Sequence, residues 1–433
     1  VVPIIEHTRL VQQINSELKN QNKQVVPAVV GKTIQLYETM NVRHGVMLVG
    51  VTLAAKTTCS RTLADAMTSI HKQCTDEGVT PLYQPVNRFV LNPKSITMGQ
   101  LYGEMNLATN EWQDGLISTL VREAVANADD SKKWIMCDGP VDAIWIESMN
   151  TVLDDNKTLC LNNGERIKLP KTMSMVFEVN DLAVASPATV SRCGMVYLEP
   201  VYLGWRAIAK SWSEQKIDTR YPGLACGDSL VRFLESTVDG ALKFVRTNCR
   251  ENVATVDFNL VTSTLNLLDS FLVESRGITT DNITDLLRPI FGFCFVWGFG
   301  GNLHDSSLKK FDEYARSALD SITQFPFGGS VYDFFVDVKT SRFAPWSGII
   351  KSFNYSRDLP FFDLVVPTVD MTRVKFLADY LISGGHNLLV TGNSGVGKTV
   401  MILDYLANVG DSYSSATKNF SAQTSAANLQ AFL

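Results

Sequence analysis

The stretch of sequence that decides the fold reads Gly392-Asn393-Ser394-Gly395-Val396-Gly397-Lys398-Thr399. It matches the pattern G-x-x-x-x-G-K-[ST] at every position, and this pattern is a phosphate-cradling loop. Residues 386–391 predict a short buried strand that runs into the loop, and residues 400–406 predict the helix that leaves it. Glycines let the backbone wrap around phosphate, while the helix N-terminus offers free N–H groups and a positive dipole end. The alternative is a glycine-rich turn that happens to precede a helix, but strand, loop and helix together favour a nucleotide site.

In such a loop Lys398 would reach the β- and γ-phosphates, and Thr399 would hold Mg²⁺. A phosphate-loop domain needs further strands after its first helix, and only residues 400–433 follow here. We therefore expect residues 361–433 to be the beginning of a domain within a longer protein. The predicted nucleotide-binding residues of this loop are Gly392, Asn393, Ser394, Gly395, Val396, Gly397, Lys398, Thr399 and Val400.

The composition is that of a soluble globular protein with two to four domains. The chain has 433 residues, of which 45% are hydrophobic and 19% charged, and its net charge is −5. This charge argues against bulk binding to nucleic acid or to an anionic membrane. The eight cysteines form no C-x-x-C pair, which favours reduced thiols over disulfides or zinc. Residues 1–7 lack a signal-peptide pattern, and the most apolar run, residues 289–300, is shorter than the ~20 residues of a membrane span and predicts a core element.

Another loop of the same spacing lies earlier in the chain, and it reads Gly50-Val51-Thr52-Leu53-Ala54-Ala55-Lys56-Thr57. Residues 43–50 predict a strand before it, and residues 59–70 a helix after it. Ala55 stands where the second glycine belongs, and its methyl group disfavours the positive φ of a tight phosphate cradle. Two readings remain open: a degraded phosphate loop, or a plain strand–turn–helix. On the first reading the nucleotide-binding residues are Gly50, Lys56, Thr57 and Thr58.

Polar residues at the ends of two later strands support the first reading. Residues 133–138 predict an apolar strand that ends in Asp138, the form of the acidic motif that holds Mg²⁺ through water. The next position, where this superfamily normally has a glutamate that polarises water, is Gly139, so hydrolysis should be slow or absent. Glu147 lies too far along the chain for a simple substitute, although the sequence leaves this open. Asn180 ends a further strand and could sense the γ-phosphate.

Strand and helix signals alternate through residues 43–200, which predicts an α/β fold with a parallel sheet and flanking helices. Helical periodicity dominates the following residues and predicts an α-helical lid subdomain. A segment rich in proline, glycine and aromatic residues then predicts a connector. The predicted domains are a large α/β subdomain at 1–200, a helical small subdomain at 201–325, a connector at 326–360, and the start of the next large subdomain at 361–433.

Three long motifs carry a resemblance to a known family, and they are Asp138–Glu147, Met149–Lys157 and Ala185–Gly194. They resemble the second AAA+ module of the dynein heavy chain, and the loop at 392–399 resembles the start of the third module. The resemblance covers nearly the whole chain. It implies P-loop AAA+ modules that bind ATP or ADP with Mg²⁺. The Mg²⁺ ligands that follow are Thr57, Asp138 and Thr399.

The resemblance also implies distinct roles for the modules. In the family the second module binds ATP with little or no hydrolysis, which agrees with Gly139, and the third is a regulatory ATPase site with Val366-Pro367-Thr368 near its adenine. Arg192 matches an arginine finger that would act in trans on the first module's site, which lies outside this chain. The alternative is an arginine that pairs with Glu199 or caps a helix.

For the whole protein, the resemblance implies a minus-end-directed microtubule motor. The degraded loop at residues 50–57 and the run Cys137–Asp142 favour an axonemal chain, located in the cytoskeleton of the cilium or flagellum, over a cytoplasmic dynein. Expected partners are the neighbouring modules of the same heavy chain, dynein intermediate and light chains, and microtubules through a stalk outside this chain, but neither nucleic acid nor membrane. By itself the segment is not expected to be a competent ATPase. Alternatives are a non-motor ATP-binding scaffold or a ribosome-assembly ring, and a heptad-patterned coiled coil further along would decide for dynein.

Overall fold

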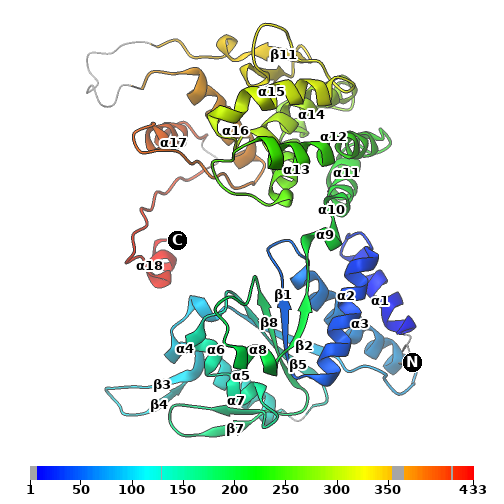
Figure 1. The fold of residues 1–433 in the computed structure, drawn as a ribbon, viewed down its shortest axis with the longest axis vertical. Coiled ribbons are helices and arrows are strands. Elements are labelled where there is room, and N and C mark those ends of the chain that lie inside the picture. The colour runs from blue at the N-terminus through cyan, green and yellow to red at the C-terminus, as the bar shows by residue number, and fades with distance from the viewer. Residues whose placement is uncertain (1–6, 128, 354–364, 411–412) are drawn as a thin grey trace. The chain divides into compact units, whose positions relative to one another are not determined.

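The computed structural model describes residues 7–127, 129–353, 365–410 and 413–433. These residues form two compact units (Figure 1). The first, which we call the α/β unit, runs to Ala207 and includes Ser425–Leu433, and the second, the helical unit, spans Ile208–Thr424. Residues 1–6 of the predicted leaderless N-terminus, residues 354–360 of the predicted connector and residues 361–364 of the last predicted domain lie outside the described residues.

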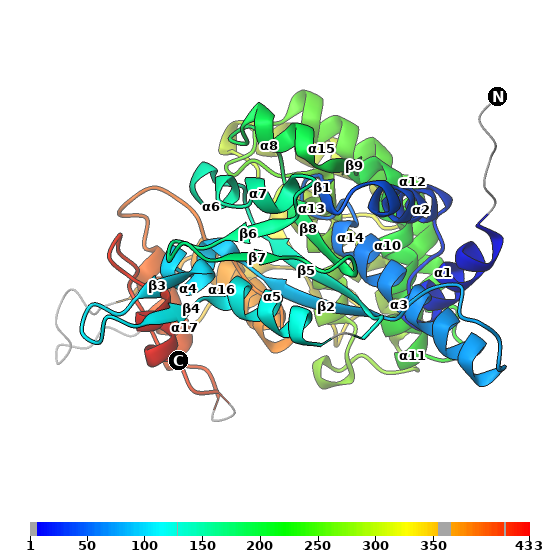
Figure 2. The same ribbon diagram turned by 90° about the horizontal axis from the view of Figure 1, so that it is seen from below.

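The α/β unit is built on a five-stranded sheet whose strands run in the order β2-β5-β8-β1-β9 (Figure 2), with every neighbouring pair parallel. Most residues of the three central strands are buried, as expected for a parallel sheet that is covered on both faces. The predicted parallel sheet is thus confirmed. The strands are β1 (Gly45–Val49), β2 (Val86–Leu91), β5 (Lys132–Asp138), β8 (Met173–Val179) and β9 (Gly194–Tyr197).

The register of the central strands brings three chain segments to one edge of the sheet. Glu178 of β8 pairs with Asp138 of β5 on one side and with Leu48 of β1 on the other. Because the carboxyl ends of parallel strands lie at the same edge, the loop after β1 and the acidic end of β5 are neighbours there. This is the edge at which open α/β sheets bind ligands.

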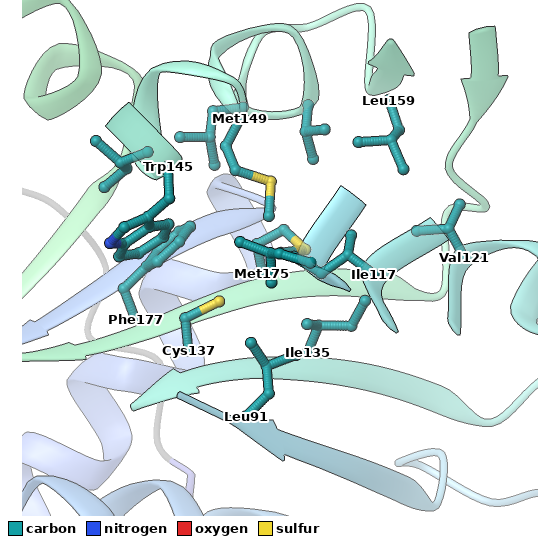
Figure 3. Close-up of a cluster of buried hydrophobic side chains, with 14 of the residues drawn as sticks. Leu91, Ile117, Val121, Ile135, Cys137, Trp145, Met149, Leu159, Met175 and Phe177 are labelled. Carbon is teal, nitrogen blue, oxygen red and sulfur yellow. The ribbon is translucent and has the colours of Figure 1, made fainter. Parts of the chain in front are cut away.

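Helices cover both faces of this sheet and enclose two separate cores. The strand β1 shows the division, because Val46 and Leu48 belong to one core and Met47 and Val49 to the other. The first core is closed by α1 (Thr8–Asn20), α2 (Pro27–Val42) and α3 (Lys56–Asp76). The second core contains Ile117, Trp145, Met149 and Phe177, among others (Figure 3). Its helices are α4 (Met98–Tyr102), α5 (Leu116–Ala126), α6 (Ala143–Glu147) and α7 (Asn150–Leu153).

Two antiparallel hairpins are added to this frame. They are β3 (Gly103–Met105) with β4 (Trp112–Asp114), and β6 (Thr158–Cys160) with β7 (Arg166–Lys168). All four strands have three residues, which is too short for a periodic signal in the sequence. The short helix α8 (Pro187–Arg192) then leads into β9.

The helical unit contains the long helices that the periodicity predicts. Its helix α14 is long and apolar enough to cross a membrane by length and composition, yet 72% of it is buried inside the structure. This supports the prediction that residues 289–300 are a core element. The helices from residue 200 onward are α9 (Pro200–Leu203), α10 (Trp205–Trp212), α11 (Asp218–Arg220), α12 (Cys226–Asn248), α13 (Asp257–Phe271), α14 (Ile283–Gly300), α15 (Asp305–Leu319), α16 (Val369–Ser383), α17 (Lys398–Ala407) and α18 (Ala426–Phe432). Of these, α9 and α18 belong to the α/β unit, and α10 crosses the boundary between the units.

An aromatic cluster joins the connector to the helices of the helical unit. The strands β10 (Phe334–Asp337) and β11 (Arg342–Pro345) pair as an antiparallel hairpin. The ring of Trp346, which follows this hairpin, lies 6.2 Å from Phe293 of α14 and 5.2 Å from Phe376 of α16. Offset and edge contacts of this kind add to the energy of burial. The connector and α16 are therefore parts of the same core as α14.

The predicted strand at residues 386–391 is wrong, because these residues have no regular secondary structure. Leu389 is 77% exposed, whereas a buried strand was expected. A strand is held by hydrogen bonds to a neighbouring strand, and the strands in the described part of the helical unit, β10 and β11, pair with each other. The helix after the loop does form, and it begins at Lys398.

Candidate functional site

The loop of residues 50–55, which we call the first loop, connects β1 to α3 at the ligand-binding edge of the sheet. Leu198 donates its backbone N–H to Val49 at 2.8 Å, which places the chain after β9 directly beside the loop. A Cβ atom on Gly50 would lie 2.1 Å from the Leu198 carbonyl oxygen. Glycine is therefore required at position 50 by the close approach of two backbone segments. No side chain caps the N-terminus of α3, so its first N–H groups remain available to a ligand.

Both phosphate-loop sequences adopt left-handed backbone at the same two positions. In the loop of residues 392–397, Gly395 and Gly397 have φ of 83°. The equivalent Leu53 and Ala55 have φ of 67° and 68°. The geometry expected of a phosphate loop is thus present at residues 50–55 despite the missing glycines, in agreement with the reading as a degraded phosphate loop. Leu53 stands where the other loop has Gly395, and the sequence analysis did not identify this second missing glycine. Aligning the two loops residue by residue would have revealed it.

The two lysines of the loops make the same contacts. The Lys56 ammonium donates to the carbonyl oxygens of Gly50 and Val51 at 2.5 and 3.1 Å. The Lys398 ammonium donates to the equivalent Gly392 and Asn393 at 2.8 and 2.6 Å. Burial lowers the pKa of Lys56, while the nearby carboxylates of Glu178 and Asp138 act in the opposite direction. Each ammonium is therefore held inside its loop, where a phosphate group could replace the carbonyl oxygens as its acceptor.

A cavity of about 390 Å³ opens in front of the first loop. This volume lies in the range of small-molecule sites. It brings together five residues predicted from the sequence, and these are Lys56, Thr57, Thr58, Asp138 and Asn180. An uncapped helix N-terminus, a lysine, a hydroxyl group and carboxylates are the donor set that phosphate and Mg²⁺ require. The residues present therefore fit a magnesium nucleotide.

The sequence reasoning missed Glu178, which also lines this cavity. It is 3% exposed, and its carboxylate accepts hydrogen bonds from the hydroxyl groups of Thr57 at 2.5 Å and Ser60 at 2.8 Å. The available signal was a carboxylate in a largely apolar strand, one position before the end of β8 at Val179. The contacts themselves join residues more than 100 positions apart, so no local pattern predicts them.

The position after Asp138 carries no side chain that could polarise water. A Cβ on Gly139 would lie 2.6 Å from Oδ1 of Asn92, so a larger residue would first have to displace that amide group. Glu147, which the sequence left as an open substitute, is exposed on α6 and does not line the cavity. The carboxylates that line it are Asp138 and Glu178.

Arg192 stands at the end of α8 and does not line the cavity. Its guanidinium forms an ion pair with Asp154 and donates to the carbonyl oxygen of Ala188, one turn back in the same helix, at 2.6 Å. Its side chain is 32% exposed. The alternative of a pair with Glu199 is therefore wrong in its partner, and the backbone contact to Ala188 lies within its own helix.

The loop of residues 392–397, which we call the second loop, lies beside a different cavity of about 420 Å³ between α16 and α17. This cavity is lined by Val390 and Met401, which flank the loop, and by His386. The His386 ring lies 3.1 Å from the carboxylate of Asp269 on α13, which also binds Arg220 at 2.8 Å. The predicted residues Gly392–Val400 are mostly exposed, and none of them is among the described residues that line this cavity. Val365 and Pro367 line a third cavity of about 620 Å³.

Models of dynein and dynein-related protein families match most of this chain. Four family models match: the hydrolytic ATP binding site of the dynein motor region at residues 1–57, the AAA domain of the dynein-related subfamily at 45–193, the dynein heavy chain AAA lid domain at 230–348, and the P-loop containing dynein motor region at 353–433.

Individual relatives agree with these matches. Human dynein axonemal heavy chain 6 is 42% identical over 99% of this chain, and human dynein axonemal heavy chain 1 is 41% identical over 98%. The dynein-1-beta heavy chain of the flagellar inner arm I1 complex of Chlamydomonas reinhardtii is 36% identical over 99%. The chain spans about a tenth of the length of these relatives, since it covers 10% of each.

Proposed function

Because this chain belongs to the dynein heavy chain family, we propose that it forms the second AAA+ module of the motor ring and the beginning of the third. The observation that carries this proposal is the pair of loops with one backbone geometry and one set of lysine contacts. The proposed divisions are a large subdomain at 1–200, a small subdomain at 201–325, a connector at 326–360 and the next large subdomain from 361.

In this proposal the first loop binds ATP with Mg²⁺ but hydrolyses it slowly or not at all. Lys56 would hold the β- and γ-phosphates, Thr57 and Asp138 would hold the metal, and Asn180 would face the γ-phosphate. Hydrolysis requires a group that orients and deprotonates water, and Gly139 has none. The nucleotide would then stay bound at this site without turnover, as a structural part of the ring. The loop at 392–399 would belong to a regulatory ATPase site.

Arg192 is the proposed arginine finger for the first module. A guanidinium at a module boundary can stabilise the charge that develops on a transferring γ-phosphoryl group. The ion pair with Asp154 supports this role, because it holds the guanidinium in place without burying it. The same contacts would suffice for a local structural role, so the two must be separated by experiment.

For the whole protein we propose a minus-end-directed microtubule motor of the axoneme, in cilia or flagella. The axonemal assignment rests on the names of its relatives. Neighbouring modules, intermediate and light chains, and microtubules contacted through a stalk elsewhere in the heavy chain are the proposed partners. For the 433-residue chain alone, Gly139 favours the second candidate of a regulatory ATP-binding scaffold.

Nucleotide binding at the first loop is tested in the 433-residue chain with Lys398→Ala, which silences the second loop. Lys56→Ala is expected to weaken MgATP binding about ten- to a hundredfold, as for loss of a charge-assisted hydrogen bond. Calorimetric titration measures the affinity, and Lys168→Ala, an exposed lysine on β7, is the matched control. Equal affinity for Lys56→Ala and Lys168→Ala would refute the proposal.

The finger is tested in the full-length heavy chain by steady-state ATPase measurements. Arg192→Ala should lower turnover by about 10³ to 10⁵, the usual effect of removing such a group. Asp154→Asn removes the ion-pair partner and keeps the arginine, so it should cost far less. If both variants lower turnover equally, Arg192 serves only the local ion pair.

A further inference from the structure

The buried carboxylate of Glu178 occupies a special place in the α/β unit. Its strand, β8, lies between β1, which leads into the first loop, and β5, which ends in Asp138. Glu178 is 3% exposed, and a carboxylate so deeply buried must be satisfied by close donors. Its hydrogen-bond donors come from α3, the helix that follows the first loop.

The two oxygens of this carboxylate bind two different hydroxyl groups. Oε2 accepts from Oγ1 of Thr57 at 2.5 Å, and Oε1 accepts from Oγ of Ser60 at 2.8 Å. The serine contact fixes the position of the carboxylate. The threonine contact then fixes the direction of the Thr57 hydroxyl proton, because a hydroxyl group has one proton to donate.

This arrangement has a consequence for metal binding. A hydroxyl group that donates its proton to a carboxylate turns its oxygen lone pairs away from that carboxylate, and its oxygen becomes a stronger ligand. Partners of this kind commonly orient metal ligands and change metal affinity 10- to 100-fold. Asp138 differs from Glu178 in that it is exposed at the edge of the cavity.

We propose that Glu178 is the positioning residue that orients the Thr57 hydroxyl toward Mg²⁺ at the first loop, while Asp138 faces the metal from the cavity. This inference rests on the proposed nucleotide site. On this inference the carboxylate that accepts the hydrogen bond from Thr57 comes from β8, the strand next to the acidic strand β5. Ser60 supports it as the second anchor of the carboxylate.

The test measures binding of a fluorescent ATP analogue to the 433-residue chain with Lys398→Ala, once with Mg²⁺ and once with EDTA. Glu178→Gln should keep the affinity in EDTA but lose about 10- to 100-fold of the enhancement by Mg²⁺. Glu147→Gln, an exposed carboxylate on α6, is the control and should keep the enhancement. Glu178→Asp, whose carboxylate is withdrawn from both hydroxyl groups, should show the same loss and serves if Glu178→Gln fails to fold.

The double variant Thr57→Val with Glu178→Gln shows whether Glu178 acts through Thr57. The inference expects no further loss beyond Thr57→Val alone, since coupled residues are not additive. A merely structural role would lower the melting temperature of Glu178→Gln but keep the Mg²⁺ enhancement, and this result would overturn the inference. If Lys56→Ala binds as well as its parent, the proposed nucleotide site fails first, and the inference fails with it.

Discussion

At the scale of single residues, the first loop shows that the surrounding frame can impose a backbone conformation. Leu53 and Ala55 adopt left-handed φ, which costs about 1–2 kcal/mol for an L-residue. The loop starts from the central strand β1 and ends in α3, whose inner face is buried in the first core. Because both ends are fixed, the loop keeps the path that glycines would have favoured.

This leads to a prediction for Ala55→Gly. The substitution relieves the strain of left-handed φ at an L-residue, about 1–2 kcal/mol. Glycine also raises the conformational entropy of the unfolded chain, which destabilises the fold by about 0.4–1 kcal/mol. We expect a net stabilisation of roughly 0.5–1 kcal/mol, measured by urea unfolding. Gly397→Ala should act in the opposite direction in the second loop.

The control for this prediction is the neighbouring Ala54→Gly. Ala54 is 2% exposed and its φ is not positive, so glycine there gains no strain relief. We expect Ala54→Gly to destabilise by about 0.5–1 kcal/mol or more. If Ala54→Gly and Ala55→Gly shift stability with the same sign, the backbone argument is incorrect.

At the scale of elements, one side chain of α5 ties the two added hairpins together. Arg122 donates from Nε to Asp114 at the end of β4 at 2.7 Å. Its two terminal nitrogens donate to both oxygens of Glu165, just before β7, at 2.7 and 2.6 Å. The planar guanidinium suits this two-pronged contact. The hairpins are therefore positioned by charge at the surface, in addition to the apolar contacts of the second core.

This contact predicts a pH-dependent stability. Hydrogen bonds from Arg122 lower the pKa of both Asp114 and Glu165 in the folded chain. A lowered folded pKa means that the stabilisation is complete above the ordinary carboxyl pKa values, about 3.9 and 4.3, and is lost as pH falls through the lowered values. Arg122→Gln should therefore be less stable than wild type at pH 6, and this difference should shrink toward pH 3.

Salt provides the check on this prediction. The groups are exposed, so the difference between wild type and Arg122→Gln should be small and should decrease further at 1 M salt. Arg166→Gln, an exposed arginine on β7, is the control, and thermal unfolding is the measurement. A difference that grows on acidification would contradict the assigned pKa directions.

At the scale of the whole molecule, the chain forms two units with separate cores. In the α/β unit, two cores lie on the two faces of the sheet. In the helical unit, the core includes the aromatic cluster around Phe293, Trp346 and Phe376. The described part of the predicted connector belongs to the helical unit, where Trp346 is buried against Phe293 and Phe376. Cooperativity is therefore expected within each unit.

Calorimetry of the Lys398→Ala chain should show this division. At a hundredfold excess over its dissociation constant, MgATP should stabilise the α/β unit by about 2.7 kcal/mol, which corresponds to roughly 5–10 °C for about 200 residues. The transition of the helical unit should stay unchanged, and Lys56→Ala should abolish the shift. A single transition that moves as a whole would contradict independent unfolding of the units.

The sequence predicted the parts of this protein that depend on local signals. The alternation of strands and helices, the presence of a helix after each loop, and the polar residues Asp138 and Asn180 beside the first loop were all readable from short stretches. It failed at residues 386–391, where an apolar run resembles a strand. A strand forms only when a neighbouring strand supplies its hydrogen bonds, and no short stretch contains that information.

The amino-acid sequence by itself determined the fold class and revealed two loops with the spacing of a phosphate loop, because periodicity and residue spacing act over a few residues. Only the tertiary structure decided the strand order, the left-handed Leu53, the partner of Arg192 and the contacts of Glu178. Each of these depends on groups far apart in the chain, and their distances are set by the packing of the whole sheet. The second loop thus carries the complete motif, while the first carries the assembled site.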